Sequence, residues 1–331
     1  MSHSNRIRPA VSVVVPLFNE EQAVAPLVTR LLRVLRSTGE RFEIVLVDDG
    51  STDGTWERIR AAHGREPAVK GVSLLRNFGH QSALLAGLTH ASGQAVVTMD
   101  GDLQHPPETI PELLRRWREG FQLVETRRRD AAGTPLLKRL TSRWFYRVFS
   151  ALSGLRLEPG SSDFRLMDRR VLRVVLQMAD ADVFLRGIVH WIGCPVSTVT
   201  YQAAPRVSGR TKFSAAKMLR LSSAAIVSFS TVPLKLGIWL GLLTSGLAAV
   251  EIVYILAMYL SGNTVPGWAS VLTLMSFMFG VLFVLLGILG TYLASIHASL
   301  RKRPRYLVED RAGLSTTPQH EETSPELALV V

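Results

Sequence analysis

The sequence predicts an α/β domain with a mostly parallel sheet, followed by a pair of membrane-spanning helices. Over the first 130 residues, short β-rich runs alternate with helical patterns, an order typical of a parallel sheet with helices on both faces. Between residues 236 and 300 the only formally charged residue is Glu251. Hydrophobic residues make up 47% of the 331-residue chain and the mean hydropathy is +0.20. These values exclude a disordered chain and indicate a membrane part.

Four runs of aliphatic and β-branched residues predict the buried strands of the sheet, at residues 11–18, 42–50, 69–75 and 94–100. Helical patterns separate them, at residues 21–37, 55–63 and 81–90. Ligands of such sheets bind at the carboxyl ends of the strands, so the residues after each run are the candidates for a site. No Gly-x-Gly-x-x-Gly follows the first or the second run, which argues against a dinucleotide-binding fold.

The second run ends in a carboxylate-rich segment, residues 48–55. Asp48 directly follows the strand, where a carboxylate can accept hydrogen bonds from a ribose or a base edge. The alternative is turn chemistry, in which Asp53 is a cap or turn residue before the next helix.

The fourth run is followed by two carboxylates, Asp100 and Asp102, with a single glycine between them. Both can turn toward one ion, and Gln104 adds an oxygen ligand. Hard oxygen ligands suit Mg²⁺ or Mn²⁺, so this segment predicts a divalent metal site. The alternatives are a solvated turn for the carboxylates and a structural role for His105.

Two long apolar stretches, residues 236–260 and 270–295, predict a transmembrane hairpin. About 20 apolar residues span a bilayer, and the short linker between the stretches returns the chain to the same side. A cluster of four cations follows at residues 301–305. By the positive-inside rule, both termini and the α/β part are cytoplasmic, at the inner (plasma) membrane. A buried helical hairpin in a large core is the alternative.

The region between the sheet and the hairpin contains two amphipathic patterns, at residues 136–152 and 214–229. The first has an apolar face flanked by Lys and Arg, which suits a helix on the membrane surface; an ordinary core helix is the alternative. We therefore divide the chain into an α/β domain (1–213), a juxtamembrane helix (214–235), the hairpin (236–300) and a basic, then disordered tail (301–331).

Four motifs occur in order before the apolar hairpin: VVVPLFNEE, VDDGSTDGT, RNFGHQSALLAG and MDGDLQHPPE. Together they resemble the family 2 glycosyltransferases of the GT-A fold, over roughly residues 10 to 308. The similarity is strongest to the branch that uses polyprenyl phosphates, which includes bacterial undecaprenyl-phosphate glucosyltransferases and dolichol-phosphate mannose synthases. The resemblance implies a Rossmann-like, mostly parallel sheet, amphipathic interface helices and a two-helix membrane hairpin.

The resemblance also implies roles for individual residues. The nucleoside is held by Pro16, Phe18, Glu20 and Asp48, with Asp100 also on the nucleotide. The metal and the diphosphate are held by Asp100, Asp102 and Gln104. The family often has Asp-Ala-Asp where this chain has Asp-Gly-Asp, a departure that keeps both carboxylates.

Two further segments match the family. Residues 206–212 resemble its Arg-x-x-Gly-x-Ser/Thr-Lys segment, so Arg206 and Lys212 are expected to bind phosphate, together with Arg127 and Arg128. Residues 160–167 match a segment near the sugar, in which Asp163 contacts sugar hydroxyls or assists as a base. Read without the family, the first is a basic surface loop and Asp163 is a turn carboxylate paired with Arg165.

The reaction implied is a single in-line attack of a polyprenyl phosphate on the sugar C1, which displaces a nucleoside diphosphate and inverts the anomeric centre. Glucose from a UDP-sugar and undecaprenyl phosphate are the expected substrates. The resemblance also implies a homo-oligomer, with a tetramer as one arrangement, and no nucleic-acid partner.

Two other functions stay open. One is a processive polysaccharide synthase, although no Gln stands where that group's Gln-x-x-Arg-Trp segment would align with Arg143 and Trp144. The other is an inactive membrane scaffold of the same fold.

Overall fold

The computed structural model describes residues 9–128, 161–178, 188–189, 192–202, 232–262, 267–301 and 304–314. The described residues do not include the predicted amphipathic segments 136–152 and 214–229, the basic segment 206–212 or the tail beyond residue 314.

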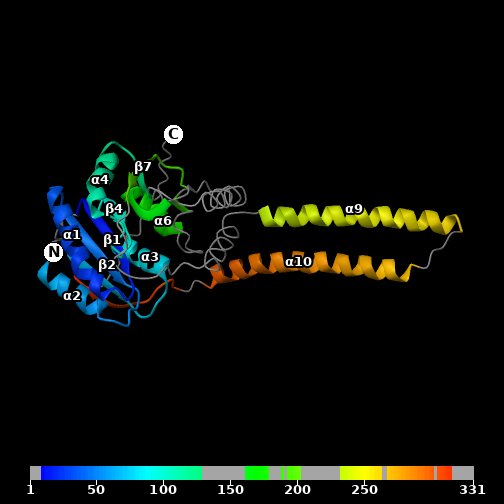
Figure 1. The fold of residues 1–331 in the computed structure, drawn as a ribbon, viewed down its shortest axis with the longest axis horizontal. Coiled ribbons are helices and arrows are strands. Elements are labelled where there is room, and N and C mark those ends of the chain that lie inside the picture. The colour runs from blue at the N-terminus through cyan, green and yellow to red at the C-terminus, as the bar shows by residue number, and fades with distance from the viewer. Residues whose placement is uncertain are drawn as a thin grey trace, which may run out of the picture. The chain divides into compact units, whose positions relative to one another are not determined.

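Within the described residues, a mixed sheet of eight strands forms the centre of the α/β part, in the order β7-β5-β6-β4-β1-β2-β3-β8 (Figure 1). Its strands are β1 (Val11–Leu17), β2 (Phe42–Asp48), β3 (Val69–Leu74), β4 (Ala95–Thr98), β5 (Leu123–Arg128), β6 (Ser161–Asp168), β7 (Val196–Tyr201) and β8 (Val308–Ala312). The four strands expected from the sequence are β1 to β4, and they pair in parallel. This confirms the expected α/β class.

On one side of the parallel centre, antiparallel pairing brings later segments to the site. β6 runs antiparallel to both β4 and β5, whereas β5 and β7 are parallel. The amino end of β6 therefore lies at the same sheet edge as the carboxyl ends of β1, β2, β4, β5 and β7. The register places Arg165 opposite Thr98, so Asp163 lies beyond the end of β4.

Helices cover both faces of the sheet, as the alternating pattern predicts. They are α1 (Glu21–Ser37), α2 (Thr55–Arg65), α3 (His80–His90), α4 (Ile110–Arg118) and α6 (Arg169–Met178), with a short turn, η1 (Pro107–Thr109). Buried residues of α1 and α4 share one core with Val13 and Val15 of β1. On the other face, Gly87 of α3 lies directly against Val14. The strand runs are apolar at consecutive positions because both of their faces are buried.

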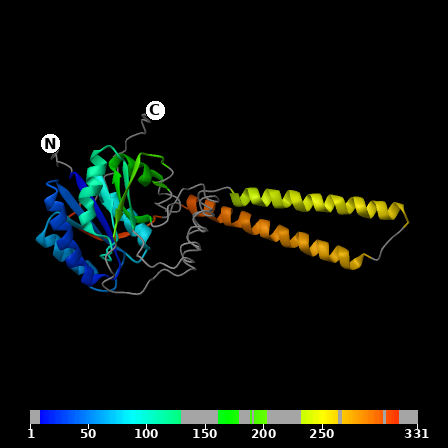
Figure 2. The same ribbon diagram turned by 45° about the horizontal axis from the view of Figure 1, so that its top comes forward.

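Two long helices, α9 (Val232–Leu260) and α10 (Trp268–Leu300), form a second compact unit. They lie side by side and antiparallel (Figures 1 and 2), with Gly237 of α9 against Leu285 of α10. Residues 234–260 and 277–297 are each long and apolar enough to cross a membrane, and neither is buried within the protein. The exposed apolar surface of these helices lacks cover in the described residues, as expected of helices that face lipid.

The chain returns from α10 to the sheet, which the sequence did not predict. β8 pairs antiparallel with β3 and forms the outer edge of the sheet. The Leu75 N–H donates to Leu307 O (2.9 Å), and the Trp56 indole N–H donates to Asp310 Oδ2 (3.3 Å). Four of the five residues in β8 are charged or small, so local sequence gives no strand signal there.

Candidate active site

The loops after β1 and β2 are joined by hydrogen bonds, which makes one rigid surface of two segments. The Asn19 N–H donates to Ser51 Oγ (2.9 Å), and the Thr52 N–H donates to Asn19 Oδ1 (2.9 Å). Asn19 has a positive φ of 53°, which asparagine tolerates better than most residues. Asp53 accepts the N–H groups of Thr55 (3.1 Å) and Glu21 (3.2 Å). Asp53 is therefore a turn residue, as the turn interpretation predicts.

Asp48 and Asp49 are both buried at the end of β2. Asp48 accepts the N–H of Ser51 (3.1 Å), while Asp49 accepts the N–H groups of Phe78 (2.8 Å) and Gly79 (3.0 Å). Burial raises the pKa of each carboxyl, and these hydrogen bonds oppose the rise. Asp49 thus fixes the loop that leads into α3, and Asp48 stays at the strand end.

Gly50 allows this loop arrangement. Its φ is +64°, and an added Cβ would lie 2.2 Å from the backbone carbonyl carbon of Arg76. Both a left-handed conformation and this close approach favour glycine.

The residues expected to hold a nucleoside lie around these two loops. Pro16 is buried in β1 opposite Val47 of β2, and Phe18 is 36% exposed just beyond the strand. Glu20 precedes α1, and its N–H donates to Thr55 Oγ1 (3.0 Å). An exposed aromatic ring just beyond the end of β1, the strand that pairs with β2, is suited to stacking on a base. The nucleoside role of these residues stays a prediction.

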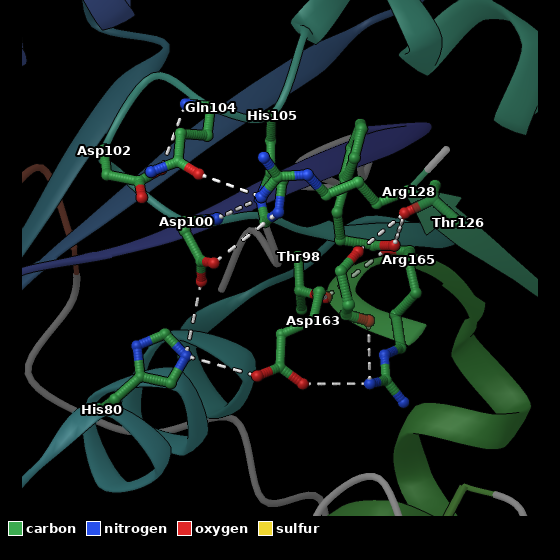
Figure 3. Close-up of polar contacts among 12 residues, drawn as sticks. His80, Thr98, Asp100, Asp102, Gln104, His105, Thr126, Arg128, Asp163 and Arg165 are labelled. Carbon is green, nitrogen blue, oxygen red and sulfur yellow. Dashed lines mark hydrogen bonds and ion pairs between the residues drawn. The ribbon is translucent and has the colours of Figure 1, made fainter. Parts of the chain in front are cut away.

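Asp100 follows β4 and lies between two histidines (Figure 3). Its own N–H donates to Nδ1 of His105 (3.0 Å), so the neutral His105 ring carries its hydrogen on Nε2, which lies 3.7 Å from Asp100 Oδ2. Nε2 of His80 lies 3.5 Å from Asp100 Oδ1. Burial raises the pKa of Asp100, and the two histidines oppose that rise. His105 is buried, and its structural role stays a prediction.

The Asp100–Gln104 loop crosses directly over the end of β1. A Cβ on Gly101 would lie 2.3 Å from Leu17 Cδ2, so glycine permits the close crossing. Asp102 Oδ1 accepts the Gln104 N–H (3.1 Å) and thereby holds Leu103 at a positive φ of 61°. A left-handed leucine is strained, and such strain is typical of functional loops.

The donor set at this loop fits a divalent cation shared with a substrate. Asp100 Oδ1 is buried and accepts no hydrogen bond, and Asp102 brings a second carboxylate two residues later. Gln104 is buried, and its Oε1 accepts a hydrogen bond from Arg128 (3.4 Å). Among the described residues, no three His, Cys, Asp or Glu side chains are grouped to hold a metal ion. The remaining ligands would have to come from Gln104, a substrate or water.

Asp163 lies on β6 beside this loop, buried rather than on a turn. Its Oδ1 accepts a hydrogen bond from Nη2 of Arg165 (3.0 Å), and its Oδ2 lies 3.6 Å from Nε2 of His80. The pairing with Arg165 is thus present, although both residues belong to a strand. The role of Asp163 toward a sugar stays a prediction.

Three rings, those of His105, Phe164 and Tyr201, pack against one another beside the site. His105 stacks on Phe164 with ring centroids 5.2 Å apart, and Tyr201 meets both rings edge-on at 5.8 Å. Burial raises the pKa of the Tyr201 hydroxyl. The rings come from β6, β7 and the loop after β4, so they fix these elements relative to one another.

Of the four cations expected to bind phosphate, two lie within the described residues. Arg127 and Arg128 end β5 at the site edge, and Arg128 pairs in register with Tyr201 of β7. Arg206 and Lys212 lie outside the described residues, although they follow β7 closely in sequence.

Sequence reasoning missed His80 and Glu125 as members of the site. His80 is inside a motif quoted for the family resemblance, but a lone histidine at a helix start carries no spacing signal. Glu125 is in a short β-rich run, and only the pairing of β5 with β6 brings it near Arg165, at 3.8 Å.

Sequence comparisons relate this chain to one family of known proteins. Residues 12–176 match the family described as Glycosyl transferase family 2. The bactoprenol glucosyl transferase of Shigella phage SfII is 37% identical over 304 residues, covering 90% of this chain and 97% of the phage protein. The prophage bactoprenol glucosyl transferase homolog of Escherichia coli (strain K12) is 37% identical over 301 residues, with coverage of 90% and 98%. An uncharacterized glycosyltransferase of Bacillus subtilis (strain 168) is 36% identical over 304 residues, with coverage of 92% and 94%.

Similarity to solved structures is more distant. Glucosyl-3-phosphoglycerate synthase from Mycobacterium tuberculosis, in complex with Mn²⁺, UDP and glucosyl-3-phosphoglycerate, has a TM-score of 0.44 at 21% identity, covering 66% of this chain and 78% of that one. Mannosyl-3-phosphoglycerate synthase from Rubrobacter xylanophilus has a TM-score of 0.45 at 17% identity, with coverage of 66% and 72%.

Proposed function

Because this chain belongs to glycosyl transferase family 2, we propose that it moves one sugar from a nucleoside-diphosphate sugar to a polyprenyl phosphate. The relatives named bactoprenol glucosyl transferases match it over nearly their whole length. They support glucose as the sugar and undecaprenyl phosphate as the acceptor. The product would be a lipid-linked sugar for later use in the cell envelope.

The observation that carries the proposal is the convergence of carboxylates at one sheet edge, in a chain that also has two exposed apolar helices. Asp48 at the end of β2 serves the nucleoside in this scheme. Asp100 and Asp102 would hold Mg²⁺ or Mn²⁺ together with the donor diphosphate, with Gln104 as a third ligand. Such an ion, when bound, neutralises charge on the leaving diphosphate.

The acceptor needs little help from a base. A phosphate monoester has a second pKa of about 6 and is largely dianionic at neutral pH, so its oxygen is already a nucleophile. The protein's main task is to bring two anions together and align them. Arg127 and Arg128 end at the site edge, and with Arg206 and Lys212 they would bind the acceptor phosphate. Asp163 would orient the sugar through its hydroxyls.

In this proposal α9 and α10 cross the inner membrane as a hairpin, and both termini are cytoplasmic. The cations at residues 301–305 support that orientation. The catalytic domain would comprise residues 1–213, with β8 returning to it, and the juxtamembrane helix residues 214–235. Glycines 241, 246, 280, 287 and 290 have open space beside them, which leaves room for close contact with further copies in a homo-oligomer such as a tetramer.

Washed membranes containing the chain test this function. A panel of radiolabelled sugar nucleotides is offered with undecaprenyl phosphate, and Asp102→Asn serves as a matched inactive control. We expect UDP-glucose to give a single-sugar lipid in the wild type alone. A polymer would instead indicate a processive synthase, and the absence of product from every donor would indicate an inactive scaffold. Either result refutes the proposal.

A further inference from the structure

Five polar side chains, Asp100, His80, Asp163, Arg165 and Glu125, contact one another in succession and connect the loop after β4 to the interior of the sheet. Figure 3 shows the first four. The successive contacts are His80 Nε2 to Asp100 Oδ1 (3.5 Å), His80 Nε2 to Asp163 Oδ2 (3.6 Å), Arg165 Nη2 to Asp163 Oδ1 (3.0 Å) and Arg165 Nη1 to Glu125 Oε1 (3.8 Å). The five residues come from the loop after β4, from α3, from β6 and from β5. No local segment could place them together.

The interior end of this chain is rigid. Arg165 is 3% exposed, and its Nη2 also donates to Ser162 O (3.2 Å). The hydroxyl of Thr98 donates to the carbonyl oxygen of Asp163. Arg165 therefore fixes one oxygen of the Asp163 carboxylate. The other oxygen, Oδ2, faces His80 and also accepts a hydrogen bond from Nε2 of Gln81 (3.5 Å).

The outer end depends on His80, the first residue of α3. Its side chain is 42% exposed, against 8% for Asp163 and 37% for Asp100. The backbone before it is held by Asp49, which accepts the Gly79 N–H (3.0 Å). Nε2 of His80 faces two carboxylate oxygens, one from Asp100 and one from Asp163, so a hydrogen on this nitrogen interacts favourably with both acids.

We propose that His80 is a positioning residue that holds Asp100 and Asp163 at a fixed separation, and so aligns the diphosphate side of the site with the sugar side. The inference rests on the proposed function, since it assigns those two sides to one sugar nucleotide. Without His80, two carboxylates on different elements would repel each other across the site. A shift of about 1 Å in such a site is enough to slow a reaction strongly.

The kinetic test compares His80→Ala with His80→Gln in the full-length chain in detergent. The donor is the sugar nucleotide that the wild type uses, and the acceptor is undecaprenyl phosphate. A glutamine can present an amide N–H to both carboxylates, whereas alanine cannot. We expect His80→Ala to lower kcat by about 10- to 100-fold with KM for the donor within about threefold, and His80→Gln to restore most of the loss. His63→Gln, on α2 and away from the site, is the matched control and should keep wild-type kinetics.

Three results would overturn the proposal. An unchanged kcat in His80→Ala means that the separation does not depend on His80. A His80→Gln variant as slow as His80→Ala makes the imidazole itself the required group. A raised KM with normal kcat places His80 in contact with the donor.

A second measurement needs neither substrate nor metal. The thermal unfolding midpoint of the metal-free chain is compared for His80→Ala, Asp163→Asn and the double variant. Residues in contact give non-additive shifts, and we expect the double variant to lose less than the sum of the single losses. Additive shifts overturn the proposal. If the wild type transfers no sugar to any lipid, the proposed function fails while this thermal test still stands, so the two failures are distinguishable.

Discussion

Replacing Asp102 with asparagine should separate the catalytic use of this loop from its folding. Asp102 Oδ1 accepts the Gln104 N–H at 3.1 Å and holds Leu103 at its left-handed φ of 61°. An asparagine keeps an oxygen acceptor at the same place, so the turn survives. The substitution removes only the negative charge that would face a cation. We therefore expect a folded, membrane-bound protein with very little activity.

The magnitudes of the two effects differ. Loss of one ligand charge should slow transfer by about 100-fold or more, which corresponds to about 2.7 kcal/mol of barrier. The stability change of Asp102→Asn should be close to zero. Asp102→Ala also removes the hydrogen bond to Gln104, so it should cost about 1 kcal/mol of unfolding free energy in addition to the rate.

The assay measures transfer from UDP-glucose to undecaprenyl phosphate, with thermal unfolding of the same samples. EDTA should silence the wild type, and Mg²⁺ or Mn²⁺ should restore it. Activity that survives both the chelator and Asp102→Asn would refute the metal assignment. Equal loss of stability in Asp102→Asn and Asp102→Ala would refute the account of the turn.

Four further substitutions test other parts of the molecule. Gly50→Ala should destabilise the protein by about 1–3 kcal/mol in thermal unfolding, because a Cβ there meets the backbone of Arg76 and φ is positive; a normal melting temperature would contradict this. Burial raises the pKa of Asp48 in the folded state above 3.8, the pKa of a free aspartate. Ionisation of Asp48 therefore lowers the free energy of unfolding as the pH rises above 3.8. Asp48→Asn should thus be the more heat-stable protein at neutral pH, with the difference fading in acid, and it should bind UDP more weakly in calorimetry; a stability gain that persists in acid would exclude this cause. Asn263→Cys in a cysteine-free background should react with an impermeant reagent added outside intact cells, and protection of this site together with labelling of a tail cysteine would reverse the topology. Lys212→Ala should slow transfer strongly while the protein still inserts in membranes, and a normal turnover rate would make residues 206–212 an ordinary surface loop.

Local patterns were sufficient for much of the fold. The buried runs that became β1 to β4 are apolar at consecutive positions, and the helical patterns between them matched α1, α2 and α3 within a few residues. The apolar stretches at residues 236–260 and 270–295 lie within α9 and α10. Each of these signals depends on residues close together in the chain, so no knowledge of distant contacts was needed.

The later strands were less accessible to sequence reasoning. β6 and β8 contain charged residues, including Arg165 and Asp310, and neither alternates in a regular way. Each forms a strand because its backbone pairs with that of a neighbouring strand. β6 pairs with β4 and β5, and β8 pairs with β3. Tertiary pairing outweighs local propensity in such segments.

By itself, the sequence determined the α/β class, the apolar hairpin and the acidic residues after the strands. The end of a strand and the length of an apolar helix can both be recognised from residues that are consecutive in the chain. Only the tertiary structure decided how those acids are held. It buried Asp163 against Arg165, placed His80 between Asp163 and Asp100, and brought Glu125 behind them. Charges from four separate elements can attract one another only after the sheet has set its register, and that register comes from long-range pairing rather than from any short stretch of the chain.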